Sequence, residues 1–193
     1  LDLIENEREK EAINIDIAFE RFNKMVDTVK KRGRLWFDWP FPIVDKYTQG
    51  IVEGKVYTIG AFSNTGKSQF SYAYVAHFLK QGKKVGYFSI EVDVGMLLSH
   101  IAKSYYGEHY QNIMMGTKKV IRDDFQNLYL YEDVFTVKDI HKITELEKFD
   151  VIFIDYIQAL HGKGDSATDK FEQIAYGIQR VAIETNCVVF SIS

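Results

Sequence analysis

The sequence predicts an α/β domain built on a mostly parallel sheet with helices on both faces. Short apolar runs alternate with helical segments from about residue 55 onward, and this alternation is typical of strands joined by crossover helices. The runs at 151–154 and 188–190 are continuously apolar, as central strands buried on both faces are. We predict strands at about 55–60, 84–90, 128–131, 151–155 and 187–192, and helices at about 66–81, 94–105, 137–148 and 168–185.

The composition excludes several other classes. The 193 residues are 46% hydrophobic with a net charge of −3, which excludes a disordered chain and is typical of one globular domain with room for a short arm. The near-neutral charge argues against non-specific nucleic-acid binding by the whole surface and leaves a local basic patch open. Cys187 is the single cysteine, so the chain cannot form an internal disulfide. No apolar run reaches roughly 18 residues, the length that a membrane-spanning helix needs. We expect an intracellular protein without a membrane partner.

Residues 1–34 are expected to form a helical arm, followed by the domain at 35–193. A helix is predicted from about residue 17 to 32, with a cap at Asp16 and a stop at Gly33. Its apolar side chains recur at helical spacing; they are Ala18, Phe22, Met25, Val26 and Val29. The sequence leaves open whether this stripe packs on its own domain or on a neighbouring subunit. The chain begins without a methionine and stops directly after the last apolar run, so we expect a fragment of a longer protein.

An aromatic connector at 35–42 holds both tryptophans and both prolines of the chain. Large aromatic side chains contribute much of the apolar area of a core. We therefore interpret the connector as a cover over the edge of the core. An aromatic shelf for a nucleotide base is the alternative.

A stretch typical of a phosphate-binding P-loop comes directly after the first predicted strand. It consists of Ala61, Phe62, Ser63, Asn64, Thr65, Gly66, Lys67 and Ser68. In such loops, backbone N–H groups and the positive end of a helix dipole hold phosphates. Lys67 is predicted to reach the terminal phosphates, and the Ser68 hydroxyl to ligate Mg²⁺. The strict pattern has glycine where Ala61 stands, so an ordinary helix start is the alternative. The position between a strand and a helix favours the nucleotide site.

Two carboxylates that follow predicted strands are candidates for the chemistry. Asp155 ends the run at 151–154, and Glu91 follows the second strand. Because the carboxyl ends of parallel strands meet at one edge of a sheet, both should lie beside the P-loop. Asp155 is expected to hold Mg²⁺ through water or Ser68, and Glu91 to aim a water at the γ-phosphate. The alternatives are an Asp155 that only caps a turn and a Glu91 that only satisfies a helix N-terminus.

Three stretches together resemble the motor domain of DnaB-type replicative helicases: the P-loop with Ala61 in its first position, residues 87–91 and residues 154–158. The resemblance extends over most of the chain from about residue 41. Residues 1–34 match loosely, in the place where that family carries its linker helix. The resemblance implies a RecA-like fold, a ring hexamer, ATP bound between subunits, and single-stranded DNA gripped by loops that face a central channel.

The resemblance also implies roles for individual residues. By position, Lys67 and Ser68 bind phosphate and Mg²⁺, Glu91 is the catalytic carboxylate and Asp155 is the second acidic element. The family's Arg finger and main DNA-binding loop would lie beyond Ser193. Its partners include primase or a loader, and the resemblance implies a cytoplasmic protein of a bacterial cell or a phage-infected host.

The loop between the Asp155 strand and the next helix is a candidate DNA contact. Glycines at 162 and 164 favour flexibility, and Lys163 and Lys170 are expected to touch DNA phosphates; a solvated connector is the alternative. No metal-site spacing links the remaining candidate ligands, which are His100, His109, His141, His161 and Cys187.

We expect an ATP hydrolase that acts as a helicase motor on single-stranded DNA in replication. Two other classes remain open. One is a RecA-like ATPase of recombination or clock type without helicase activity, and the other is a non-catalytic nucleotide-binding module used for assembly. An intact Glu91 argues against the second.

Overall fold

The computed structural model describes residues 14–32, 37–48, 50–62, 65–162 and 166–193. Contacts divide the chain into two compact units, Leu1–Phe37 and Asp38–Ser193, and each is described by itself. None of the helices in these ranges is both long and apolar enough to cross a membrane.

The first unit contains helix α1 (Ile15–Arg32). Asn14 precedes it, and the Asn14 side-chain oxygen accepts a hydrogen bond from the backbone N–H of Asp16 at 3.2 Å. A bond to the second helical residue is typical of an N-cap, so the predicted cap at Asp16 is wrong and Asn14 takes that place. Most residues of the predicted apolar stripe are exposed; Phe22, for example, is 57% exposed. The predicted stop at Gly33 lies outside the described residues.

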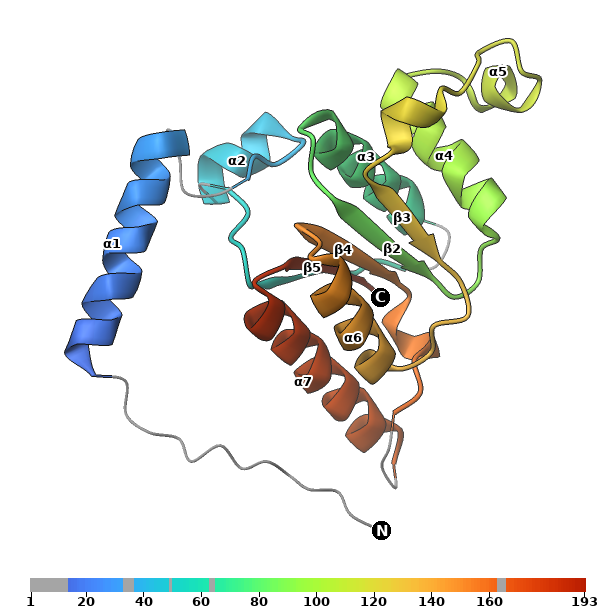
Figure 1. The fold of residues 1–193 in the computed structure, drawn as a ribbon. Coiled ribbons are helices and arrows are strands. Elements are labelled where there is room, and N and C mark those ends of the chain that lie inside the picture. Colours follow the sequence, from blue (N-terminus) through green and yellow to red (C-terminus); the bar gives the residue numbers. More distant parts are fainter. Residues whose placement is uncertain (1–13, 33–36, 49, 63–64, 163–165) are drawn as a thin grey trace. The chain divides into compact units, whose positions relative to one another are not determined.

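The second unit is built on a five-stranded sheet in the order β1-β5-β4-β2-β3, with every neighbouring pair parallel (Figure 1). The strands are β1 (Val56–Ile59), β2 (Val85–Ser89), β3 (Leu128–Tyr131), β4 (Val151–Asp155) and β5 (Val188–Ile192). The α/β fold class is confirmed, and each strand lies within one residue of its predicted bounds. β4 and β5 are interior strands, which explains their continuously apolar runs.

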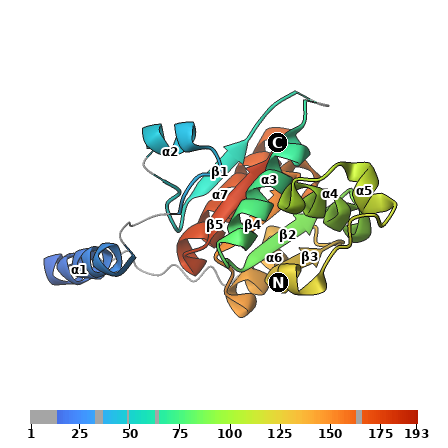
Figure 2. The same ribbon diagram turned by 90° about the horizontal axis from the view of Figure 1, so that it is seen from above.

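Helices cover both faces of this sheet (Figures 1 and 2). One face carries α3 (Lys67–Lys80) and α4 (Val94–Tyr106), and the other carries α6 (Val137–Glu147) and α7 (Ala167–Thr185). All four were predicted within one residue. The sequence analysis missed the short elements α2 (Pro42–Thr48), α5 (Tyr110–Met114), η1 (Arg122–Phe125) and η2 (Ile157–Ala159). Segments of about two turns or fewer are too short for their apolar residues to display a helical period.

Four aromatic side chains lie in register across the sheet on the face that α3 covers. Tyr57, Phe190, Phe153 and Tyr87 are Cα partners on β1, β5, β4 and β2, and successive ring centroids are 5.5, 4.9 and 5.6 Å apart. We call them the aromatic row. Trp39 packs edge-on against Tyr57 and Phe190, so this part of the aromatic connector covers the core at the β1 edge, as predicted.

The opposite face of the sheet carries the other half of the core. Ile152 and Ile154 of β4 are fully buried there with Ile178 of α7 and Ile140 of α6. The two halves together hold β4 rigidly between helices, because buried side chains pack at close to crystal density. The carboxyl end of β4 is therefore a fixed position for a functional side chain.

Candidate active site

The phosphate loop connects β1 to α3, as the sequence predicted. Gly66 is the N-cap residue of α3 and has a φ of 93°. It offers no side-chain oxygen to accept hydrogen bonds from the amides of the first turn. Only glycine adopts this left-handed conformation without strain. The uncapped amides at the helix N-terminus, together with the helix dipole, favour an anion at this point. Ser63 and Asn64 of the loop lie outside the described residues.

Lys67 lies over the loop that it follows. Its Nζ donates a hydrogen bond of 2.7 Å to the carbonyl oxygen of Ala61, and the Thr65 hydroxyl donates to the carbonyl of Phe62 at 2.6 Å. The Ala61 amide in turn donates to the carbonyl of Ser193 at 3.4 Å, after β5. The loop is thus tied to the carboxyl end of the sheet, with the ammonium group of Lys67 held at its surface.

The two predicted carboxylates lie at this same edge of the sheet. Asp155 pairs in register with Ser89, the last residue of β2, and the backbone N–H of Ile90 donates to the Asp155 carbonyl at 3.1 Å. Glu91 follows Ile90 directly. Asp155 and Glu91 therefore lie at the same edge of the sheet, as expected from the sequence, because β2 and β4 are parallel neighbours.

The pKa of the Asp155 carboxyl is raised above its ordinary value. Burial is the largest cause, and the nearby Glu91 carboxylate raises the pKa further. Hydrogen bonds from the hydroxyls of Tyr87 and Ser68, and the charge of Lys67, act in the opposite direction and favour the ionised form. A half-buried carboxylate whose ionisation is opposed by burial gains most from a cation placed beside it.

The oxygen donors at this edge fit a magnesium ion. Ser68 and Asp155 supply a hydroxyl and a carboxylate that lie near enough for the hydroxyl to lower the pKa of the carboxyl, and Mg²⁺ prefers hard oxygen ligands. Within the described ranges, no three His, Cys, Asp or Glu side chains form a cluster that could hold a metal. Mg²⁺ is usually bound through one or two protein oxygens and the phosphates of a substrate.

Sequence reasoning missed three hydroxyl groups of the site. The Tyr87 hydroxyl donates to Asp155 Oδ2 at 2.7 Å. The Ser71 hydroxyl lies 3.0 Å from the Tyr87 hydroxyl. Burial raises the pKa of Tyr87 well above its ordinary value, so the phenol stays a donor. The Tyr156 hydroxyl lies near the Glu91 carboxylate, which raises the pKa of Tyr156. The available signal was a tyrosine inside the apolar strand before Glu91, since a buried phenol needs a polar partner.

The candidate DNA contacts are only partly described. Lys170 is exposed in the first turn of α7, a helix whose start is fixed by a capping box between Ser166 and Asp169. Lys163 lies outside the described residues. His161, at the start of this loop, stacks on Phe135 at 5.3 Å.

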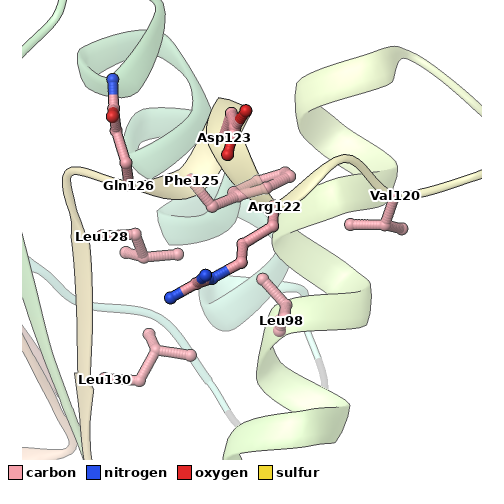
Figure 3. Close-up of a pocket in the computed structure, with 8 residues that line it drawn as sticks. All are labelled: Leu98, Val120, Arg122, Asp123, Phe125, Gln126, Leu128 and Leu130. Carbon is pink, nitrogen blue, oxygen red and sulfur yellow. The ribbon is translucent and has the colours of Figure 1, made fainter.

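A cavity of about 660 Å³ lies away from this site, between α4, η1 and the edge strand β3 (Figure 3). Leucines of α4 and β3 surround the Arg122 side chain in it (Figure 3). The cavity shares no lining residue with the phosphate loop or with the two carboxylates.

The five-stranded parallel sheet and its phosphate loop define a RecA-like ATPase domain. The family of the DnaB-like helicase C terminal domain matches residues 39–193, and the chain belongs to that family. No curated protein matches it.

Solved structures that share the fold include the ATPase domain of G40P and a DnaB-like replicative helicase. The ATPase domain of G40P superposes with a TM-score of 0.78 at 19% sequence identity, over 95% of this chain and 72% of that chain. A DnaB-like replicative helicase, described with its interactions with primase, superposes with a TM-score of 0.73 at 19% identity, over 95% of this chain and 48% of that one. This chain therefore spans about half the length of the second structure.

Proposed function

We propose that this chain is the ATP-binding and ATP-hydrolysing motor domain of a replicative DNA helicase that translocates on single-stranded DNA and unwinds duplex. The observation that carries the proposal is the assembly of Lys67, Ser68, Asp155 and Glu91 at one edge of a parallel sheet. Membership in the DnaB-like helicase family supports it.

The phosphate loop, residues 61–68, would bind the phosphates of ATP through its backbone amides. Lys67 would exchange the carbonyl of Ala61, which lies 2.7 Å from its Nζ, for the terminal phosphates, because a charged phosphate is the stronger acceptor for an ammonium group. Ser68 and Asp155 would hold Mg²⁺, which supplies charge neutralisation between the β- and γ-phosphates when it is bound.

Glu91 would orient the attacking water. Its carboxylate is exposed at the sheet edge, and it lies near enough to the Tyr156 hydroxyl to raise the pKa of that phenol. A carboxylate that is open to solvent suits a general base.

The proposed partners follow from the family and belong to the whole protein. We propose self-association into a ring, expected to be a hexamer, with ATP at the contact between subunits. Single-stranded DNA would contact Lys163 and Lys170, and primase or a loader would bind the assembled ring. The primase contact described for a helicase of the same fold supports this last step.

The test compares Glu91→Gln with the parent and with Glu172→Gln, which changes an exposed glutamate of α7. All three are made in the whole protein, because the proposed site is completed at the contact between subunits. Single-turnover ATP hydrolysis is measured over a protein concentration series, with and without single-stranded DNA, and ATP affinity is measured separately. Glu91→Gln should lower the rate about 10²- to 10⁴-fold and leave the affinity unchanged or higher, because a negative charge near the phosphates is removed. The Glu172→Gln chain should behave as the parent.

Two outcomes would contradict the proposal in different ways. Hydrolysis by Glu91→Gln at close to the parent rate would place the catalytic base elsewhere. Robust hydrolysis without any unwinding of a forked duplex by the whole protein would instead favour an ATPase of recombination or clock type.

A further inference from the structure

The Tyr87 side chain joins the second strand to the candidate Mg²⁺ site. It is fully buried, and its hydroxyl donates to Asp155 Oδ2 at 2.7 Å. An ionised carboxylate can only accept, so the proton of this bond comes from the phenol. Charge-assisted hydrogen bonds of this kind are about twice as strong as neutral ones.

The same hydroxyl is linked to the phosphate-loop helix. Ser71, in the second turn of α3, lies 3.0 Å from the Tyr87 hydroxyl and 2.8 Å from the carbonyl oxygen of Ser68. Its single proton bonds to one of these two oxygens at a time. The Ser68 hydroxyl is near enough to the Asp155 carboxyl to lower its pKa, so four residues on α3, β2 and β4 form a ring of contacts.

The aromatic row fixes the direction of the Tyr87 hydroxyl. The Tyr87 ring lies nearly parallel to that of Phe153, with an interplanar angle of 11° and centroids 5.6 Å apart, and Phe153 is stacked in the same way on Phe190. A ring held on its face by close packing cannot turn without displacing its neighbours. The phenol oxygen is therefore a rigid point against which a carboxylate can be oriented.

We propose that Tyr87 is a positioning residue for the Mg²⁺ site, holding the Asp155 carboxylate toward Ser68 before the ion and the nucleotide arrive. The proposal for Tyr87 rests on the proposed function. It extends that function by assigning a role to a residue outside the phosphate loop and the two carboxylates. Without the phenol, Asp155 would lose the partner that fixes its plane and would have to be ordered when the ion binds. Groups that hydrogen-bond a metal ligand typically contribute about 10- to 100-fold to metal affinity.

The test uses Tyr87→Phe, which removes the hydroxyl and keeps the ring. Tyr74→Phe is the matched control, because Tyr74 is buried on α3 and contacts Phe190 of the same aromatic row at 5.1 Å. Binding of Mn²⁺ together with ADP is followed by electron paramagnetic resonance, which separates ion binding from hydrolysis. Tyr87→Phe should raise the Mn²⁺ concentration for half-saturation about tenfold, with ADP affinity in the absence of the ion unchanged. Tyr74→Phe should leave both unchanged.

A double-mutant cycle separates positioning from a general loss of structure. In an Asp155→Asn background, Tyr87→Phe should have no further effect on Mn²⁺ binding, because the group it orients is already changed. An equal effect in both backgrounds, or an unchanged Mn²⁺ requirement in Tyr87→Phe, would overturn the inference. If Tyr87→Phe does not fold, Ser71→Ala tests the same contact ring, with a smaller rise in the Mn²⁺ requirement expected and an unchanged requirement overturning the inference.

The two proposals fail in distinguishable ways. If the parent chain binds ADP with no dependence on Mn²⁺, the Mg²⁺ site of the proposed function fails and the role of Tyr87 fails with it. If the parent depends on Mn²⁺ and Tyr87→Phe shows the same dependence, only the role of Tyr87 is wrong.

Discussion

The ammonium nitrogen of Lys67 lies 2.7 Å from the carbonyl oxygen of Ala61, at the opposite end of the phosphate loop. In this hydrogen bond the charged ammonium group donates to a neutral acceptor of its own loop. A phosphate is a stronger acceptor for an ammonium group than a carbonyl, because both partners are then charged. The observed contact is therefore one that a nucleotide can displace.

Lys67→Ala should weaken ATP binding at least about tenfold, since a hydrogen bond to a charged group contributes about 1.5–3 kcal/mol. Calorimetric titration of the chain with ATP and Mg²⁺ measures the change. The matched control is Lys138→Ala, which removes an exposed lysine of α6 and should leave the affinity as it is. Equal affinities for Lys67→Ala and the parent would rule out the phosphate-loop interpretation.

Asp155→Asn should stabilise the ligand-free chain. Burial raises the pKa of the Asp155 carboxyl above its ordinary 3.8 in the folded state. The folded chain therefore binds this proton up to a higher pH than the unfolded chain does, and above the raised pKa the ionised carboxylate opposes folding. The midpoint of thermal unfolding should be higher for Asp155→Asn than for the parent at about pH 8, with the gap narrowing toward about pH 4. A parent that is the more stable of the two at the higher pH would contradict this.

Cys187 should be unreactive in the folded chain. Its side chain is fully buried directly before β5. Burial raises the pKa of the thiol, so the nucleophilic thiolate is suppressed. Labelling with a thiol-specific disulfide reagent should be at least about 100-fold slower under native conditions than in denaturant. Because the chain has one cysteine, the signal reports this site alone. Rapid native labelling would show that the chain around Cys187 opens or that the core is packed differently.

Gly86→Ala should destabilise the fold by about 1–3 kcal/mol, the usual cost of overpacking a core. A Cβ at this position of β2 would lie 2.9 Å from Cε2 of Phe149. Phe149 is itself buried and in edge contact with Tyr129, so it has little room to move. Gly60→Ala is the control, because a Cβ there meets nothing within 4 Å. Denaturant unfolding should show a loss of stability in the first variant alone, and equal losses in both would point to backbone effects instead.

The site residues differ in how far the sequence could predict them. Lys67 and Ser68 stand in a local motif, and the positions of Asp155 and Glu91 followed from one rule about the ends of parallel strands. Tyr87 and Tyr156 stand in the stretches at 87–91 and 154–158 that carry the family resemblance, but no role followed from the sequence for them or for Ser71. Their roles depend on distances between elements that are far apart along the chain. Tyr87 and Asp155 are 68 residues apart and meet only because β2 lies beside β4.

By itself, the sequence determined the five strands, the four long helices and the parallel class of the sheet, because apolar period and strand–helix alternation are local properties of the chain. It also determined which side chains carry charge at the strand ends. Only the tertiary structure decided the strand order, the alignment of Tyr57, Phe190, Phe153 and Tyr87 in one row, and the hydrogen bond from Tyr87 to Asp155. The physical reason is that strand order and register are chosen by the packing of all the buried side chains together, and no short stretch of sequence contains that information.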